Sequence, residues 1–587
     1  MKLFKKLLFF LNKKQKIGTA FLTIMIFIGA LLETLGVSAI IPVVQMMMVP
    51  DSIQDVKYIS FISKLFGIYD SDDIFMFLLA TMIAIYVVKN LYLLLLIYVQ
   101  SKFVNDNRAG TQAKLLEWYL NRPYEYFLYA DVAEILRIIR SDIQNVFEIL
   151  LELMRLLTEI LVSLCIAIFL FATDWKMTLF LALLTMTVTL AVTKGLKKHI
   201  GGLGRKDQGF IAILTKWILQ SMNGIKIVKV MQKESYFDEH YRVDAQKQAK
   251  LNTRYAVFNA IPRLLLETVF ISGILLYLMV SMSNGADMVQ MAAIISAFAV
   301  AAFRILPSVS RMNTHLANLA YYEPSLTIIY DMVEKEGYDN VFNRKIIAED
   351  EVRVNETAAG TKFTTKDKIE FKEVTFAYPN TEKKILDSAN MVLPIGSSIG
   401  IKGPSGAGKT TVVDILLGLL DMNEGVILCD GLDIKEYRNE WLSHIGYIPQ
   451  NVYLTDNSIK MNIAFGMNDT EISEERVWEV LREAQLEEFV NELPDGIETA
   501  VGEQGVRISG GQKQRMGIAR ALYHNPEILV FDEATSALDN ETETAIMDAI
   551  AQFKGKKTMI IIAHRLRTIE QCDIIYEVSK GQILRER

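Results

Sequence analysis

Long apolar runs alternate with charged stretches in the first 333 residues of the chain. Six of these runs reach about 20 residues, the length that an α-helix needs to cross the hydrocarbon core of a bilayer. They cover residues 17–48, 74–99, 146–171, 177–199, 256–283 and 288–310. The pattern therefore predicts an α-helical transmembrane domain with six spans, residues 1–333.

Lysine and arginine are distributed unevenly between the segments that join these runs. The N-terminal 16 residues hold six, the segment 100–145 holds six and the segment 194–254 holds thirteen, whereas the remaining loops hold three together. Because positive charge collects on the cytoplasmic side of membrane proteins, we expect the N-terminus and both long segments in the cytoplasm. We expect the two segments to be helical extensions of the spans, whose tips near 121–127 and 221–229 meet a cytoplasmic partner.

The first loop on the opposite side, residues 51–73, is amphipathic. Ile53, Val56, Ile59, Ile62 and Phe66 recur at steps of three or four residues, a spacing that is typical of one helix face. Two interpretations are open at this point. The segment is either a short helix packed on the other spans or an interfacial helix that contacts lipid or a lipid substrate.

The character of the chain changes after the last span. Residues 334–368 are polar and have no apolar period, which indicates a linker. Residues 369–587 alternate short β-branched runs, glycine turns and helical patterns, as in an α/β domain. The net charge of −6 and the absence of a basic block exclude a nucleic-acid partner from the expected functions.

The stretch SSIGIKGPSGAGKTTVV, residues 397–413, contains a glycine-rich motif. Gly403, Gly408, Lys409 and Thr410 satisfy the pattern G-x-x-x-x-G-K-S/T. A short strand precedes the motif and an apolar helix follows it, which is the context of a phosphate-binding P-loop. Backbone N–H groups would cradle phosphates at the helix N-terminus. We expect Lys409 to contact the β- and γ-phosphates and Thr410 to bind Mg²⁺.

Two further motifs extend this prediction. An apolar strand in EILVFDEATSALD, residues 527–539, ends in two carboxylates. We expect Asp532 to hold Mg²⁺ and Glu533 to polarise the attacking water. In RISGGQKQRMGIARAL, residues 507–522, a serine and paired glycines open a helix, which repeats the anion-binding arrangement.

These motifs together resemble those of the ATP-binding cassette (ABC) transporters. The sequence ISGGQ, 508–512, is similar to the family signature, although Ile508 stands where leucine is usual, and VGEQG, 501–505, has Gln504 where arginine is common. The resemblance implies that Gln450 couples Mg²⁺ to the membrane half, that His564 orders the γ-phosphate, that Tyr378 stacks on adenine and that Asp539 contacts a partner subunit. The ATP-binding residues it implies are Tyr378, Gly403, Pro404, Ser405, Gly406, Ala407, Gly408, Lys409, Thr410, Thr411, Ser509, Gly510, Gly511, Gln512 and Asp539.

The resemblance also implies the reaction and the assembly. In this family the signature of one subunit closes over the phosphate loop of another. A chain with one of each and six spans would form a homodimer, or pair with a similar half-transporter, around two shared sites for ATP and Mg²⁺. Glu533, Gln450 and His564 are the expected catalytic residues, and Thr410, Gln450 and Asp532 the expected Mg²⁺ ligands. The activity implied is ATP hydrolysis coupled to transport.

Basic residues within the spans indicate the cargo. They are Lys89, Arg263, Arg304 and Arg311. Structural pairing is one explanation, since Arg263 could pair with Glu267, and Glu33 with Lys89. The alternative is that the residual positive charge faces a cavity and binds an anion, because charges in a membrane segment usually mark a substrate path. Arginine suits phosphate in particular.

The segments ETLGVSAIIP (33–42), IPRLLLE (261–267) and FRILPSVSR (303–311) are similar to those of PglK-type flippases. That resemblance implies ATP-driven flipping of a polyprenyl-diphosphate-linked oligosaccharide for protein glycosylation, in the bacterial cytoplasmic membrane. The alternative within transport is an exporter of other lipids, drugs or peptides with the same ATPase. A non-transporting, membrane-anchored ATPase is the competing class, and six spans with long cytoplasmic extensions disfavour it.

Overall fold

The computed structural model describes residues 2–38, 71–173, 175–283, 288–342, 363–379, 381–502, 505–533, 550–562 and 569–587. These residues divide into two compact units. One unit, here called the helical unit, comprises Met1–Arg122 and Tyr129–Arg344; the other, the α/β unit, comprises Pro123–Leu128 and Lys345–Arg587. A helical half followed by an α/β half confirms the predicted fold class.

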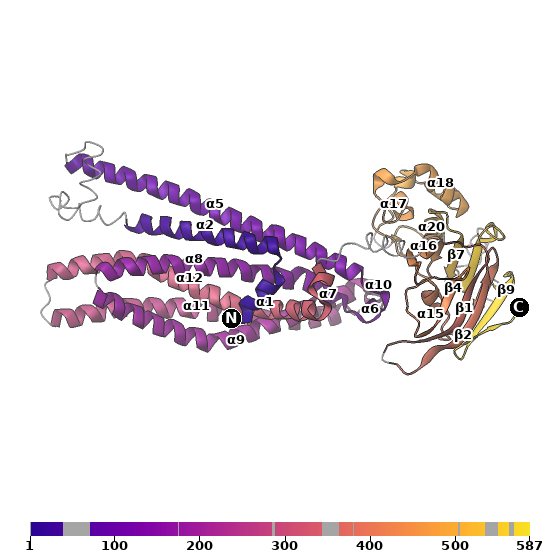
Figure 1. Ribbon diagram of the computed structural model, residues 1–587, viewed down its shortest axis with the longest axis horizontal. Coiled ribbons are helices and arrows are strands. Elements are labelled where there is room, and N and C mark those ends of the chain that lie inside the picture. Colours follow the sequence, from indigo (N-terminus) through magenta and orange to yellow (C-terminus); the bar gives the residue numbers. More distant parts are fainter. Residues whose placement is uncertain are drawn as a thin grey trace. The chain divides into compact units, whose positions relative to one another are not determined.

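As far as it is described, each predicted span lies in a long helix of the helical unit, and Figure 1 shows these helices side by side. The four longest have about 50 residues, or roughly 75 Å at 1.5 Å per residue. They therefore extend well past a bilayer core of about 30 Å, as predicted. The long helices are α2 (Lys13–Ser38), α5 (Ser71–Leu120), α8 (Ile143–Thr173), α9 (Trp175–Asn223), α11 (Glu234–Ser283) and α12 (Met288–Glu336).

Within the described residues, four helix segments are long and apolar enough to cross a membrane: Lys13–Gly36, Asp73–Leu120, Thr178–Asn223 and Glu234–Val280. The first predicted span continues past the end of α2 into residues that lie outside the described part, and so do residues 51–70 of the predicted amphipathic helix. Short helices complete the unit: α1 (Lys2–Phe10), α7 (Val132–Arg137), α10 (Ile225–Val230) and α13 (Tyr338–Phe342). Helix α6 (Tyr124–Tyr129) belongs to the α/β unit except for its last residue.

Helix α8 is buried on several sides where it begins. Ile143, Val146, Phe147 and Ile149 are each at most 1% exposed although they do not share one helix face. So wide an apolar face indicates that this part of α8 packs against several neighbouring helices. The neighbours of α8 include the N-terminal helix α1, whose Phe10 ring lies 6.0 Å from that of Phe147.

The α/β unit contains two sheets. The first has the strand order β2-β1-β4-β5 and is antiparallel, and the second has the order β10-β9-β3-β8-β7-β6 and is parallel except for the hairpin of β9 and β10. The strands are β1 (Lys368–Ala377), β2 (Lys384–Pro394), β3 (Ser398–Lys402), β4 (Glu424–Cys429), β5 (Leu432–Asp433), β6 (Ile445–Ile448), β7 (Ile528–Asp532), β8 (Thr558–Ile562), β9 (Ile574–Ser579) and β10 (Gln582–Arg585).

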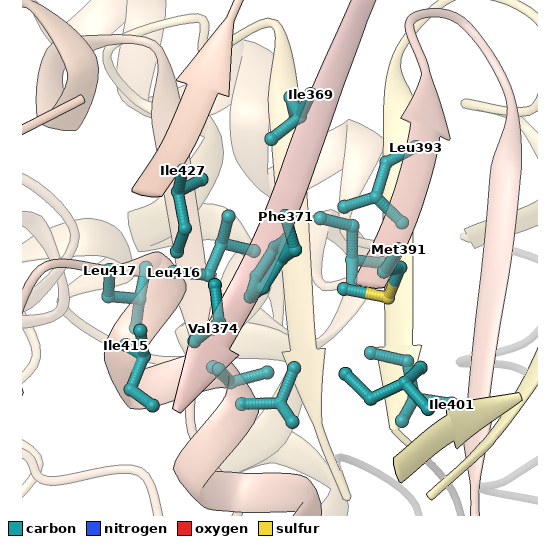
Figure 2. Close-up of a cluster of buried hydrophobic side chains, with 14 of the residues drawn as sticks. Ile369, Phe371, Val374, Met391, Leu393, Ile401, Ile415, Leu416, Leu417 and Ile427 are labelled. Carbon is teal, nitrogen blue, oxygen red and sulfur yellow. The ribbon is translucent and has the colours of Figure 1, made fainter. Parts of the chain in front are cut away.

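A hydrophobic cluster joins the two sheets to the helix that follows β3. Figure 2 shows Phe371 of β1 among side chains from β2, β3, β4 and this helix, α15 (Lys409–Leu416). Strands β7 and β8 are buried along their whole length, as expected for central strands of a parallel sheet. The core therefore fixes the ends of β3, β7 and β8 relative to one another. The other helices are α16 (Arg438–Ser443), α17 (Ile459–Ile463), α18 (Glu474–Glu483), α19 (Glu487–Asn491) and α20 (Gly510–Leu522).

The predicted linker, residues 334–368, includes the end of α12 and all of α13, and residues 343–362 lie outside the described part. Phe363 is 7% exposed and its ring lies 6.3 Å from that of Trp441. The Asp430 carboxylate accepts hydrogen bonds from the backbone N–H groups of residues 366–368 at 2.7–2.9 Å. The chain is therefore held in place before it enters β1.

Candidate functional site

The phosphate loop joins β3 to α15, as the motif predicted. Gly408 precedes α15 and has φ of 100°, in the left-handed region that favours glycine. A Cβ atom on Gly403 would lie 2.4 Å from the carbonyl oxygen of Val578, and one on Gly408 would lie 2.6 Å from Ile385 Cγ2. Both glycines are therefore needed for the loop to pack this closely.

Lys409 is 5% exposed and lies over the loop that precedes it. Its Nζ atom donates to the carbonyl oxygens of Gly403 at 3.0 Å and Pro404 at 3.1 Å. Neutral carbonyls are weaker partners for an ammonium group than phosphate oxygens. The position of the charge thus suits a phosphate held at the N-terminus of α15, where backbone N–H groups have no helical acceptor.

Three of the predicted catalytic and metal-binding residues meet at the carboxyl ends of neighbouring strands. Asp532 ends β7, Glu533 follows it, and Gln450 comes shortly after β6, which pairs with β7 in parallel. The Nε2 atom of Gln450 donates to Glu533 Oε2 at 2.7 Å, and the backbone N–H of Glu533 donates to the carbonyl oxygen of Ile562 at 3.0 Å. The structure therefore brings Gln450, Asp532 and Glu533 together.

The surroundings of Asp532 suit a cation. Its side chain is buried, Oδ2 accepts from the Tyr447 hydroxyl at 3.3 Å, and Oδ1 has no hydrogen-bond partner among the described residues. Burial and the neighbouring Glu533 raise the pKa of Asp532. Burial and Asp532 raise the pKa of Asp414, one helical turn after Thr410, to about 6. A divalent cation would relieve this repulsion between carboxylates, so these residues fit the predicted Mg²⁺.

Tyr378 follows β1 and has a fixed orientation. Its ring centroid lies 5.0 Å from that of Phe376 in an edge-on arrangement. Its hydroxyl shares a hydrogen bond of 3.1 Å with the hydroxyl of Thr411, the third residue of α15. The ring is therefore held beside the first turn of α15, although the predicted contact with adenine stays a prediction.

The signature segment begins α20 with a capping box. Ser509 Oγ accepts from the backbone N–H of Gln512 at 3.2 Å, and Gln512 Oε1 accepts from the backbone N–H of Ser509 at 2.8 Å. This reciprocal arrangement satisfies two of the backbone donors at the helix start. His564 and Asp539 lie outside the described residues, so their predicted roles stay predictions.

The basic residues of the spans have different environments. Lys89 is 5% exposed and its ammonium lies 4.6 Å from the centre of the Tyr86 ring, with no ion pair recorded among the described residues. Arg263 is exposed on α11. The side chain of Arg304 lies outside the described part. Arg311 pairs with Glu159 of α8, its Nε at 2.5 Å and its second guanidinium nitrogen at 3.1 Å.

Comparison with known proteins supports both the transmembrane half and the ATPase half of the chain. The profile of the ABC transporter transmembrane region matches residues 22–305, and that of the ABC transporter ATPase matches residues 386–536. An ATP-dependent lipid A-core flippase of Yersinia pestis is 30% identical over 426 residues, which are 71% of this chain and 69% of the relative. The chain belongs to the ABC transporter family.

Other relatives of this ABC transporter have the same name. The ATP-dependent lipid A-core flippase of Pectobacterium atrosepticum is 41% identical over 220 residues, which are 37% of this chain and 38% of the relative. A solved structure, of a bacterial Atm1-family ABC exporter with ATP bound, matches with a TM-score of 0.73 and 21% identity over 97% of this chain and 95% of that chain. This likeness shows the exporter fold. ATP hydrolysis coupled to transport is therefore the activity of the family to which the chain belongs.

The sequence reasoning missed three residues of these sites. Tyr447 precedes Gln450 by three residues on β6, and Asp414 follows Thr410 by four on α15, a spacing that places both on one helix face. That spacing was a usable signal for Asp414. Glu159, the partner of Arg311, gave none, because 152 residues separate the two.

Proposed function

We propose that this ABC transporter is a lipid flippase whose cargo carries a phosphate-bearing head group. Two relatives, matched over 71% and 37% of the chain, are named lipid A-core flippases, which favours a lipid of that kind as cargo. A polyprenyl-diphosphate-linked oligosaccharide has the same two chemical parts, an apolar tail and an anionic phosphate group. It is therefore the second candidate rather than a different class of cargo.

The observation that carries this proposal is the environment of Lys89. An ammonium group within a spanning helix is costly unless an anion or a ring compensates it. Here the Tyr86 ring offsets part of that cost, and no carboxylate pairs with Lys89 in the described part of the chain. Gly36 leaves room for the lysine, since a Cβ there would lie 3.3 Å from Lys89 Cδ. A phosphate group would complete the neutralisation.

Arg311 adds a second, exchangeable cation. Its side chain is 49% exposed while Glu159 is 13% exposed, so the pair has one open side. Ser308 also donates to Glu159, at 2.5 Å, and can keep this carboxylate hydrogen-bonded when the arginine moves. We propose that a phosphate group competes with Glu159 for Arg311. Arg263 and Arg304 stay in the proposal as further cavity cations.

In the ATP site, Lys409 and the phosphate loop bind the phosphates and Tyr378 supports the adenine. Thr410, Gln450 and Asp532 hold Mg²⁺, which supplies positive charge against the phosphate oxygens. Glu533 accepts a hydrogen bond from Gln450, and this contact orients its carboxylate toward the attacking water. We also propose that His564 contacts the γ-phosphate.

Ser509, Gly510, Gly511, Gln512 and Asp539 complete the site of a second subunit, so we propose a homodimer, with a similar half-transporter as the other possible partner. An exposed apolar tip supports a partner for the α9–α11 hairpin: Met222, Ile227, Val230 and Met231 are each 59–76% exposed. We further propose that the dimer resides in the bacterial inner membrane with its N-terminus and ATPase domains in the cytoplasm.

The test compares Lys89→Met with Lys102→Met, an exposed lysine further along α5. Lys89→Met keeps the length of the side chain and removes its charge. We expect it to lower the flipping of phosphate-bearing lipids in proteoliposomes by roughly tenfold, which corresponds to 1.4 kcal/mol, while basal ATP hydrolysis continues. Lys102→Met should flip lipid at the wild-type rate.

The lipid panel contains lipid A-core, a polyprenyl-diphosphate glycan and an uncharged glycolipid. Preference of the wild type for the first over the second separates the two candidates. Flipping of all three at equal rates, unaffected by Lys89→Met, would refute the role of the head group. ATP hydrolysis without movement of any lipid would favour the non-transporting ATPase.

A further inference from the structure

A cavity of about 270 Å³ lies within the helical unit, between α1, α8, α9, α11 and α12. Most of the side chains that line it are apolar, and Asn313 and Glu323 of α12 are the polar ones among them. Representative wall residues are Leu153, Leu196, Ile200, Phe258 and Ala317. The cavity contains none of the residues assigned above to ATP or to the cargo.

The walls come from the same end of several spans. Leu153 lies near the start of the third predicted span, Leu196 near the end of the fourth, and Phe258 near the start of the fifth. By the distribution of positive charge these ends face the cytoplasm. The cavity therefore begins at the depth of the cytoplasmic leaflet, and its lining residues of α12, within 313–323, extend it past the cytoplasmic end of the sixth predicted span.

An apolar cavity of this size suits an apolar ligand. A cavity of about 150 Å³ lined by leucine, isoleucine and phenylalanine stays dry and binds apolar molecules. Empty volume also lowers stability because its lining loses contacts. In a membrane, the apolar molecule available at this depth is the acyl chain of a lipid.

The surroundings of the cavity indicate the head group. Leu3 and Phe4 of α1 line it, Phe4 is 55% exposed, and the exposed Lys5 follows. A short basic amphipathic helix of this kind lies at the membrane interface. On α9, the exposed Lys194 lies two residues before Leu196, which lines the cavity. Lys5 therefore places positive charge next to a residue that lines the cavity, which suits a lipid phosphate, whereas Lys194 lies on a different face of α9 from Leu196.

Glu323 makes the charge pattern more specific. Its side chain lines the cavity and is half-buried, and no ion pair is recorded for it in the part of the chain that the structure describes. A carboxylate beside a phosphate site disfavours a purely anionic lipid. The same carboxylate would pair with a head group that carries an ammonium group beyond its phosphate.

We propose that this cavity binds one acyl chain of an aminophospholipid of the phosphatidylethanolamine type. Lys5 of α1 contacts its phosphate, and Glu323 contacts its amine. The bound lipid joins α1 to four of the long helices and stabilises the helical unit. It is a resident lipid and is distinct from the transported cargo, so this proposal stands whatever the cargo is.

The experiment uses the full-length protein purified in detergent, with phosphatidylethanolamine, phosphatidylglycerol and phosphatidylcholine of identical chains. Thermal unfolding and native mass spectrometry report stabilisation and the number of bound lipids. We expect phosphatidylethanolamine to raise the melting temperature by about 2–4 °C more than the other two lipids. One lipid per chain should survive delipidation.

Two variants test the site, each with a matched control. Ala317→Phe fills the cavity and should abolish the specific shift and the retained lipid, whereas Ala182→Phe adds the same ring at an exposed alanine of α9 and should retain both. Glu323→Gln keeps the volume and should make the three lipids equivalent, whereas Glu267→Gln, at an exposed acid of α11, should not.

Equal shifts for all three lipids in the wild type would overturn the proposal. So would a phosphatidylethanolamine shift that survives both Ala317→Phe and Glu323→Gln. If Ala317→Phe does not fold, Glu323→Gln alone decides the role of the amine, and retention of the preference for phosphatidylethanolamine in that variant refutes it.

Discussion

The α/β unit and the helical unit position their charged residues by different means. In the α/β unit, Gln450, Asp532 and Glu533 lie at the ends of adjacent parallel strands, and backbone contacts fix them. In the helical unit, polar residues meet across helices that are far apart in the sequence. Residue 159 meets 311 in this way, and residue 152 meets 315.

The two units also differ in how buried charge is compensated. Asp532 has an oxygen without a hydrogen-bond partner in the described residues, as suits a site for a cation. Glu152, which is 3% exposed, instead hydrogen-bonds to His315 and accepts from Asn318 at 3.0 Å. We conclude that the ATP site is organised to receive a ligand, whereas much of the polarity among the spans is already satisfied within the protein.

The variant with the largest expected effect disrupts the ATP site. Glu533→Gln should lower ATP hydrolysis by roughly 100-fold or more, because a positioned general base contributes about 10²–10⁴-fold. ATP binding should persist, since Lys409 and the phosphate loop are unchanged. Steady-state phosphate release measures the rate of ATP hydrolysis, and equilibrium nucleotide binding measures the affinity for ATP. Glu492→Gln, at an exposed acid after α19, is the control, and near-normal hydrolysis in Glu533→Gln would show that this carboxylate is not the base.

An intermediate effect tests whether polarity among the spans is structural or functional. Glu159→Gln leaves the half-exposed Arg311 without its carboxylate and should cost about 1–3 kcal/mol of the free energy of unfolding. The exchanged pair, Glu159→Arg with Arg311→Glu, should recover most of that stability because opposite charges meet again. Thermal unfolding measures this recovery.

The exchanged pair should nevertheless lose the stimulation of ATP hydrolysis by phosphate-bearing lipids, since a carboxylate now occupies the open position. ATPase assays with and without lipid provide this second measurement. Full lipid stimulation in the exchanged pair would mean that the contact between α8 and α12 is only structural. The helical unit would then differ even more from the ATP site, because this ion pair would have no part in binding a ligand.

The last comparison concerns Tyr378, where the smallest effect of all is expected for Tyr378→Phe. Tyr378→Ala should weaken ATP binding by roughly 5- to 150-fold, since stacking of an aromatic ring on a base contributes about 1–3 kcal/mol. Tyr378→Phe keeps the ring and loses only the hydrogen bond to Thr411, so its affinity should stay within about fivefold of wild type. Equilibrium nucleotide binding compares the two, and equal losses would assign the effect to the hydroxyl and reject stacking.

Much of the ATP site could be predicted because its chemistry is local in the sequence. The spacing from Gly403 to Thr410 determines a turn and a helix start, and apolar runs before Asp532 determine a strand that must be buried. Parallel strands place their carboxyl ends at one edge of a sheet, so the location of Asp532 and the phosphate loop at the same edge follows from these patterns. Tyr447 was not predicted because a tyrosine on a strand belongs to no recognisable motif.

The spans show the limit of this reasoning. By itself the sequence determined that six segments are apolar and long enough to be helical, because each helix satisfies its own backbone hydrogen bonds whatever lies beside it. Only the tertiary structure decided which charges neutralise one another. Arg311 of α12 meets Glu159 of α8, and Lys89 of α5 meets Gly36 of α2, through the packing of whole helices. That packing depends on the shapes of two helix surfaces at once, and no periodicity within either segment encodes it.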